Sequence, residues 1–147
     1  MAVVEKTVLV NHSSEKMYHL VDQVENYPKF LPWCGGSELH LRTIDTTEAT
    51  IHIDYHSIKQ SFTTKNYNKP YEMIEIKLLK GPFKQLHGSW QFIQLNASAC
   101  KIIFNLHYEF SSRILEKILG PVFNHIANTF VDAFINQAEI LYGDDEL

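Results

Sequence analysis

The feature that most constrains the fold is a change of hydrophobic period along the chain. Over residues 37–110, apolar residues alternate with polar ones at a period of two, most clearly in residues 49–55. Over residues 112–142, apolar residues instead recur every three to four positions. The first pattern is typical of antiparallel strands with one packed face, and the second of an amphipathic helix. A sheet covered by one long helix is therefore predicted.

The alternating region divides into six strands, and a further strand precedes it. The six strands are expected around residues 37–42, 49–56, 60–67, 74–78, 86–95 and 101–110, with the earlier one at residues 3–10. Between the first strand and the other six, apolar residues at helical spacing predict a helix over residues 17–24. Pro28 fits the first turn of a second, short helix, and residues 32–36 are expected to form a turn.

The last segment is expected to be a helix of about 45 Å at 1.5 Å per residue. One row of apolar side chains at i+4 spacing runs along it: Ile114, Ile118, Val122, Ile126, Phe130, Phe134 and Ala138. The predicted fold is α+β, a curved seven-stranded antiparallel sheet wrapped around a long C-terminal helix. The space between the sheet and the stretch Ile126–Phe134 is either filled by side chains or left as a cavity.

Length and composition are those of one globular domain. The 147 residues are interpreted as a single domain, 1–147, whose acidic end, residues 143–147, is expected to fray. Cys34 and Cys100 lie too far apart in sequence for a zinc or redox motif. The N-terminus lacks a signal-peptide pattern, and no apolar run approaches the roughly 20 residues that span a bilayer. The expected location is the cytoplasm.

The charge is unevenly distributed. The chain carries a net charge of −4, which argues against broad affinity for nucleic acid, DNA included. Between Lys59 and Lys84, however, six lysines face only two glutamates. These lysines are either solvated side chains on exposed strands or a surface for an anionic partner. Lys65, Lys80 and Lys84 are the candidate partner-binding residues.

Two stretches resemble a known family. Residues 24–34, Val-Glu-Asn-Tyr-Pro-Lys-Phe-Leu-Pro-Trp-Cys, and residues 80–92, Lys-Gly-Pro-Phe-Lys-Gln-Leu-His-Gly-Ser-Trp-Gln-Phe, resemble the START-like coenzyme-Q-binding family, also described as cyclase/dehydrase-like. The chain is most similar to the bacterial branch of ribosome-association toxins, RatA. The resemblance implies a helix-grip, Bet v-like fold with an apolar cavity under the C-terminal helix.

The resemblance leaves three functions open. The first is a non-catalytic protein that binds ubiquinone, or another isoprenoid or lipid, in support of cellular respiration. The second is a RatA-type toxin that binds the large ribosomal subunit and blocks subunit association. The third is a small-molecule cyclase or dehydrase. The first is the leading hypothesis, and it requires no cofactor.

Aromatic side chains are the candidate ligand-binding residues. They are Tyr27, Phe30, Trp33, Tyr55, Phe83, Trp90, Tyr108, Phe130 and Phe134. Such residues fill a packed core as readily as they line a pocket for an apolar ring.

The segment Tyr27–Trp33 is the candidate entrance to the cavity, because two prolines stiffen it and three aromatic residues crowd it. If its rings pack under the first helix, they form a satellite core. If Trp33 is instead partly exposed at the rim, it suits gripping a quinone ring or peripheral contact with the inner membrane.

Catalytic and metal chemistry find little support in the sequence. His52 and His56 are four residues apart on a strand, so about 13 Å separates them, which is too far for one metal ion. The sequence places no base beside Cys34 to make it a nucleophile. Its glycines form no phosphate-binding loop. We therefore expect neither catalytic residues nor a metal site.

Overall fold

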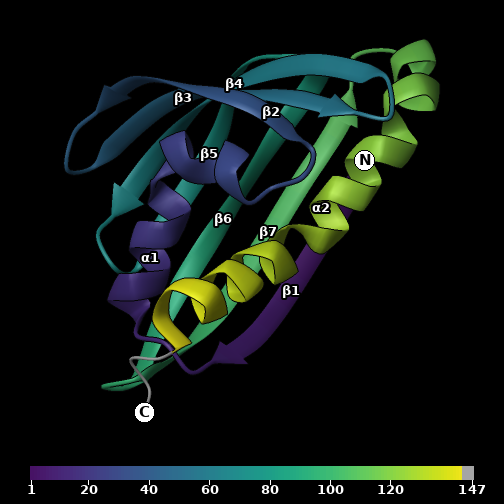
Figure 1. The fold of residues 1–147 in the computed structure, drawn as a ribbon. Coiled ribbons are helices and arrows are strands. Elements are labelled where there is room, and N and C mark those ends of the chain that lie inside the picture. Colours follow the sequence, from purple (N-terminus) through teal and green to yellow (C-terminus); the bar gives the residue numbers. More distant parts are fainter. Residues whose placement is uncertain (144–147) are drawn as a thin grey trace.

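The computed structural model describes residues 1–143 as seven strands and three helices (Figure 1). The strands are β1 (Ala2–Val10), β2 (Cys34–Arg42), β3 (Thr46–Tyr55), β4 (Ile58–Lys69), β5 (Met73–Lys80), β6 (Phe83–Asn96) and β7 (Ala99–Phe110). The helices are α1 (Ser14–Asp22), the 3₁₀ helix η1 (Val24–Lys29) and α2 (Arg113–Tyr142). The order of elements is the one that the hydrophobic periods predict. The remainder of the predicted acidic tail, residues 144–147, lies outside the described residues.

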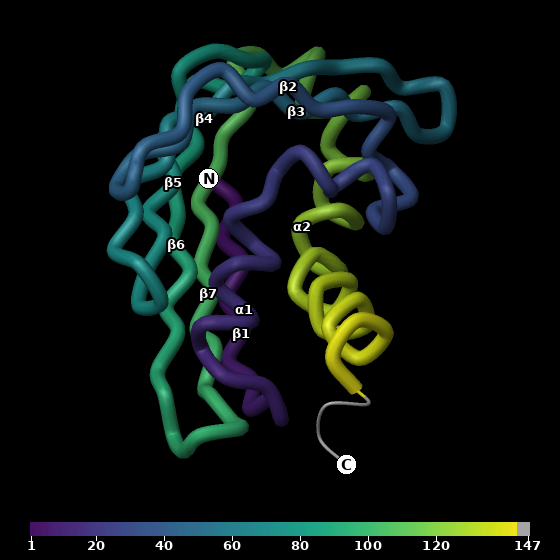
Figure 2. Tube along the Cα trace, turned by 60° about the vertical axis from the view of Figure 1, so that its left-hand side comes forward, coloured from purple at the N-terminus to yellow at the C-terminus, as the bar shows by residue number. Residues whose placement is uncertain are grey.

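All seven strands join in one antiparallel sheet. Their order is β1-β7-β6-β5-β4-β3-β2, so the first strand pairs with the last. Ala2 lies opposite Tyr108, and Val10 lies opposite Cys100. The sheet curves so strongly that β2 and β3 lie across one end of the helices while β5, β6 and β7 form a wall beside them (Figure 2). The predicted α+β helix-grip architecture is confirmed.

Helix α2 covers the concave face of the sheet because its apolar stripe matches the inward residues of the strands. Inward positions alternate strictly along β7, where Cys100, Ile102, Phe104, Leu106, Tyr108 and Phe110 are buried. On α2, Phe134 and Ala138 are completely buried. Helices α1 and η1 complete the cover at the other side of the concavity (Figure 1).

The predicted apolar row of α2 is only partly buried. Ile114 and Ile118, at its beginning, are 71% and 54% exposed. The first turns of α2 extend past the end of the sheet, at the top right of Figure 1, so nothing covers that part of the row. The first two members of the predicted apolar row therefore do not pack on the sheet.

The connection before β2 also differs from the prediction. Pro28 lies near the end of η1, and not in the first turn of a helix. The turn ends at Trp33, and β2 begins at Cys34, because the Asp54 amide donates a hydrogen bond to the Trp33 carbonyl at 2.9 Å. A Cβ atom on Gly35 would lie 2.8 Å from the Cβ atom of Asp54. Glycine at this position thus lets β2 start in close contact with β3.

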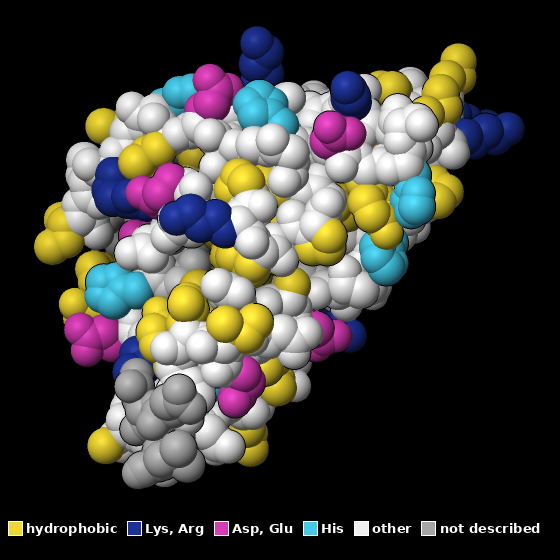
Figure 3. Space-filling model, viewed as in Figure 1, with side chains coloured by type: hydrophobic (Ala, Val, Ile, Leu, Met, Phe, Trp, Pro, Cys, Tyr) yellow, Lys and Arg dark blue, Asp and Glu magenta, His cyan; other side chains and the backbone are white. Residues whose placement is uncertain are grey.

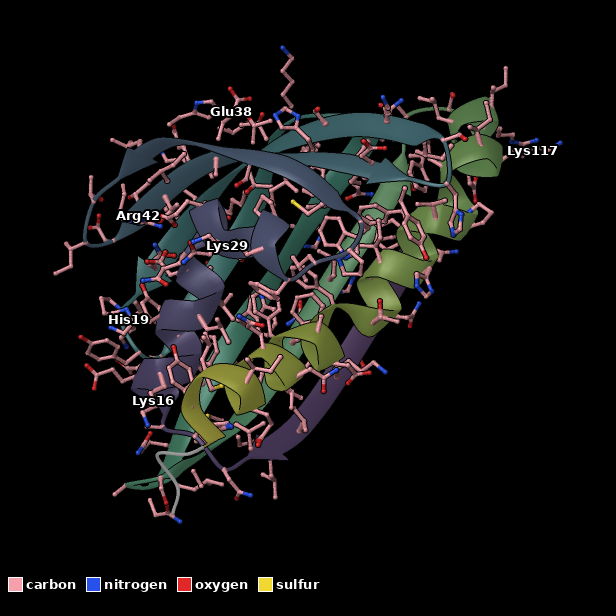
Figure 4. The ribbon with its side chains drawn as sticks, in the orientation of Figure 1. Lys16, His19, Lys29, Glu38, Arg42 and Lys117 are labelled. Carbon is pink, nitrogen blue, oxygen red and sulfur yellow. The ribbon has the colours of Figure 1, made fainter. Side chains whose placement is uncertain are left out.

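A charged clamp fixes the helical connection to the sheet. Arg42, on β2, donates to both carboxylate oxygens of Glu25 at 2.6 and 2.9 Å, and to the Asp22 carbonyl at 2.9 Å. Figure 4 shows Arg42 reaching from β2 toward the junction of α1 and η1. Bidentate pairing of this kind is the strongest form of side-chain ion pair.

Within residues 1–143, no helix is long and apolar enough to cross a membrane.

Candidate functional site: an apolar cavity beneath the C-terminal helix

A cavity of about 70 Å³ lies between the concave face of the sheet and α2. Its floor includes Ile51, Ile74 and Leu106, and its roof includes Ile126 and Ala127. The predicted position, between the sheet and the stretch Ile126–Phe134, is confirmed. Short side chains occur in both walls, Thr64 on β4 and Ala127 on α2, and they leave space that the surrounding rings do not fill.

Four of the predicted aromatic residues line this cavity: Tyr27, Trp33, Trp90 and Phe130. Phe130 lies at their centre. Its ring centroid is 5.7 Å from that of Trp90, 6.0 Å from that of Trp33 and 6.3 Å from that of Tyr27. These tilted and edge-to-face contacts are the geometries that aromatic rings prefer. The four residues, drawn from η1, the following turn, β6 and α2, therefore form one aromatic wall.

Trp33 lines the cavity as a buried residue. It is 4% exposed, and so is Tyr27, which packs against Phe134 at 5.2 Å. The alternative in which Trp33 is exposed at a rim is therefore wrong. Phe30 remains half-buried, 5.2 Å from Phe134. Figure 3 shows apolar side chains reaching the surface on the face that carries η1 and α2.

Phe83 and Tyr108 lie outside the cavity wall, in a second aromatic cluster. Phe83 is 4.9 Å and Tyr108 is 4.7 Å from Phe123 of α2, measured between ring centroids. Phe110 stacks on Phe83 at 5.1 Å. Phe123 alone of these residues also lines the cavity. The second cluster thus supports the roof of the cavity and closes its end nearest the start of α2.

Phe134 and Tyr55 also lie outside the wall. Phe134 is completely buried behind Phe130, with 5.0 Å between the two ring centroids. Tyr55, at the end of β3, stacks on His125 of α2 at 5.9 Å. Both residues hold the helix against the sheet from positions next to the cavity.

The buried tyrosines near the site have satisfied hydroxyl groups. The Tyr27 hydroxyl donates to the Val21 carbonyl, and the Tyr108 hydroxyl donates to the Asn124 side-chain oxygen. Burial raises the pKa of both Tyr27 and Tyr108 above the ordinary value of a phenol. Both groups therefore stay protonated at neutral pH and serve packing, which does not favour a role in proton transfer.

The two cysteines are buried thiols. The Cys34 thiol donates to the Gly36 carbonyl at 3.3 Å, and burial raises its pKa. Burial raises the pKa of Cys100 to about 11. Since the thiolate is the reactive form, neither residue has the character of a nucleophile.

Two polar residues in the cavity wall were missed from the sequence. Thr64 and Asn66 are both inward-facing residues of β4 that line the cavity. The signal was present, because the apolar alternation of the neighbouring strands is interrupted at these positions. It was not recognised as a site, since polar residues in a strand are ordinarily assigned to its exposed face.

The candidate partner-binding lysines do not line the cavity. Lys65 contacts Glu48 at 3.7 Å, and Lys84 contacts Glu109 at 3.5 Å. Lys80, at the end of β5, is exposed. The acidic neighbours offset part of the local positive charge that the sequence shows.

His52 faces outward from β3, because its neighbours Ile51 and Ile53 are the buried residues of that strand. His52 contacts the Glu38 carboxylate at 2.9 Å and, through its other ring nitrogen, the Ser61 hydroxyl. Figure 4 labels Glu38 at the outer edge of the sheet. Among residues 1–143, no group of three or more histidine, cysteine or acidic side chains is arranged to hold a metal ion.

Known proteins resemble the chain over nearly its whole length. Residues 10–135 match the family described as polyketide cyclase / dehydrase and lipid transport. The ribosome association toxin RatA of Pseudomonas aeruginosa is 38% identical over 140 residues, which cover 95% of this chain and 97% of that protein. The mitochondrial coenzyme Q-binding protein COQ10 homolog B of Xenopus laevis is 24% identical over 143 residues, 95% of this chain and 59% of that protein.

A solved structure with the same fold is the Zhui aromatase/cyclase of Streptomyces sp. R1128. Its TM-score is 0.77 and its sequence identity 17%, over 94% of this chain and 93% of that one. At this identity the likeness concerns the fold alone.

Proposed function

Because the chain belongs to the polyketide cyclase/dehydrase and lipid transport family, we propose that it is a non-catalytic binding protein which encloses an apolar molecule beneath α2. The observation that carries this proposal is the cavity itself, whose walls are almost entirely apolar and aromatic. The ligand class that fits is an apolar ring with an isoprenoid chain, such as ubiquinone, or another lipid. The resemblance to a relative named for coenzyme Q binding supports the same class.

The size of the cavity implies that it opens for its ligand. Its volume of about 70 Å³ is less than half of the roughly 150 Å³ of an engineered cavity that accepts benzene. A quinone ring therefore requires a movement of the wall. Phe130 is the residue best placed to move, because it is half-buried and belongs to α2, which closes the concave face.

Apolar burial is the expected source of affinity. A ring that buries about 200 Å² gains roughly 5 kcal/mol at 25 cal/mol per Å², which corresponds to a dissociation constant near 0.2 mM. Tighter binding needs contacts with a chain beyond the ring. An isoprenoid ligand partitions into lipid, so the proposal also places the protein at the inner membrane surface when it loads.

The test is chemical extraction of protein purified from its own host under native conditions. Unmodified protein should release a quinone or another isoprenoid, detected by mass spectrometry. Ala127→Phe fills the cavity and should release none, whereas Asn128→Phe adds the same ring at the next, exposed position and should keep the ligand. Equal recovery from both variants, or no lipid from unmodified protein, would contradict the proposal.

A second function is favoured by the relatives named RatA, which are 38% identical to this chain over nearly all of its length. In this alternative the protein acts in the cytoplasm, binds the large ribosomal subunit and blocks subunit association. Lys65, Lys80 and Lys84 would contact ribosomal RNA phosphates. Such contacts release counterions, so binding should weaken steeply as salt rises.

Sedimentation with purified large subunits tests the second function. Changing Lys65, Lys80 and Lys84 to Glu should abolish co-sedimentation without altering the fold. A matched variant changes Lys6, Lys29 and Lys117 to Glu, so it carries the same change of charge elsewhere on the molecule and should still bind. If unmodified protein does not co-sediment, or binds independently of salt, the ribosome hypothesis fails.

A further inference from the structure

The inner face of β4 differs from the inner faces of its neighbours. Strand β3 presents Ala49, Ile51 and Ile53 to the interior, whereas β4 presents Thr64, Asn66 and Asn68 in succession. Inward polar groups in a sheet are costly unless they form hydrogen bonds. The three residues of β4 therefore require an explanation.

Asn68 is explained by a structural network. Its side-chain nitrogen donates to the Thr47 hydroxyl at 2.9 Å, and that hydroxyl donates to the Asp22 carboxylate at 3.1 Å. The chain of hydrogen bonds connects β4 and β3 to the end of α1. Asn68 thus fixes the first helix to the sheet through its side-chain nitrogen. Its side-chain oxygen is buried without a partner, as that of Asn66 is, but Asn68 does not line the cavity.

Thr64 and Asn66 have no such explanation. Both line the cavity, and neither side chain forms a hydrogen bond with any residue from 1 to 143. The Asn66 side-chain oxygen is also completely buried. A buried acceptor without a partner lowers stability, and an apolar residue of similar shape would avoid that loss. Two adjacent inward positions of β4 therefore carry polar groups that the folded chain itself does not use.

We propose that Thr64 and Asn66 form the polar pole of the cavity and bind a hydroxyl group on the ring of the ligand, which among quinone-like ligands is carried by the reduced, quinol form. This inference rests on the proposed ligand-binding function. The remaining wall, with Trp33, Trp90 and Phe130, contacts the apolar part of the ring. A hydroxyl both donates and accepts hydrogen bonds, so it satisfies the Asn66 amide in either orientation, and the Thr64 hydroxyl as well. An ether or carbonyl oxygen can only accept.

The test compares small probes of nearly equal size. Phenol and toluene differ by a hydroxyl in place of a methyl group, and anisole carries an oxygen that only accepts. Binding of each is measured by calorimetry to the unmodified protein and to the double variant Thr64→Val, Asn66→Leu. The ratio of phenol affinity to toluene affinity should be at least about ten times larger in the unmodified protein than in the double variant. Thr63→Val makes the same Thr-to-Val change on the opposite face of β4 and should leave this ratio unchanged.

Two further readouts keep the test decisive. The double variant without ligand should melt at a higher temperature than the unmodified protein, since it removes unpaired polar groups. In the unmodified protein, phenol but not toluene should shift the side-chain amide signals of Asn66 in NMR spectra, which needs no variant at all.

Each outcome has a distinct meaning. If all probes bind and the phenol-to-toluene ratio is equal in both proteins, the polar pole is wrong while the binding function stands. If the affinity of anisole relative to toluene is raised in the unmodified protein as much as that of phenol, the assignment to a hydroxyl is overturned. If no probe binds, the proposed ligand-binding function fails, and this inference fails with it.

Discussion

The rings of Trp90 and Phe130 lie 5.7 Å apart, centroid to centroid, and join the floor of the sheet to helix α2 at the edge of the cavity. Phe134, one helical turn further on, contacts the same Trp90 ring at 5.3 Å. The two phenylalanines differ in their surroundings. Phe134 is 0% exposed and fully packed, whereas Phe130 is half-buried and borders the cavity.

This difference predicts unequal losses of stability. Phe134→Ala should lower the free energy of unfolding by about 3–5 kcal/mol, as for other fully packed phenylalanines. Phe130→Ala should cost about 1–2 kcal/mol less, because part of its ring surface is already free of contacts. Urea unfolding of both variants measures the difference. Equal losses would indicate that Phe130 is ordinary core and not a movable part of the wall.

Trp33 provides a fluorescence test of ligand entry. The chain has two tryptophans, so Trp90→Phe leaves Trp33 as the sole reporter. Since Trp33 is 4% exposed and lines the cavity, its emission should be that of a buried indole. A short-chain quinone should quench it saturably, and an aliphatic control should not. Quenching that rises linearly without saturation would contradict entry of the ring into the cavity.

The Arg42–Glu25 clamp predicts a pH dependence of stability. The hydrogen bond from Arg42 lowers the pKa of Glu25 from its ordinary value of 4.5. A lowered pKa in the folded state adds stability that is present above pH 4.5 and is lost as the pH falls through the folded-state value. Because 43% of the Glu25 side chain is exposed, screening limits the gain to about 0.5–1 kcal/mol.

Glu25→Gln measures this contribution. The variant should be less stable than the unmodified protein at pH 7, and the two should converge as the pH falls below 4.5. Glu5→Gln, an exposed position on β1 far from the clamp, serves as the control and should follow the unmodified protein. A constant difference at all pH values would show that the effect does not arise from the Glu25 charge.

Two glycines give predictions of different size. A Cβ atom on Gly88 would lie 2.2 Å from the Asn105 carbonyl oxygen, so Gly88→Ala forces β6 and β7 apart. It should cost about 3 kcal/mol or more and reduce soluble yield. An added Cβ on Gly120 would find open space outside the helix backbone, with the Glu116 side chain 4.0 Å away. Because Pro121 follows and disfavours helical backbone at a preceding residue that carries a Cβ, Gly120→Ala should change the free energy of unfolding by less than about 1 kcal/mol. Thermal unfolding compares both, and stabilisation by Gly88→Ala would contradict the close strand pairing.

The fold was predictable from the sequence because alternation is a direct record of which face of a strand is buried. Strand β7 shows this most simply, since every second residue from Cys100 to Phe110 is buried. The exposed start of α2 was not predictable, because Ile114 and Ile118 continue the same apolar row although the sheet ends before them. Periodicity gives the face of a helix, but not the length of the surface that it meets.

The position of the cavity was predicted correctly. The sequence could not show which aromatic residues line the cavity and which only support its wall. Phe83 and Phe130 are both inward phenylalanines, and only the curvature of the sheet assigns one to a supporting cluster and the other to the wall. Thr64 and Asn66 were missed for the opposite reason. A polar residue in a strand is ordinarily exposed, so the inward direction of β4 had to be known before these two could be recognised.

The pairing of β1 with β7 sets when this protein can reach its native state during synthesis. Ala2 is made about a hundred residues before its partner Tyr108. Helix α2 is made later still, and until then the part of the concave face that it covers stays open. Contacts so distant in sequence slow folding and leave apolar surface open to chaperones and to aggregation. The nascent chain therefore completes its sheet only after β7 has been made, so a surface formed by that sheet is offered to partners only from that point on.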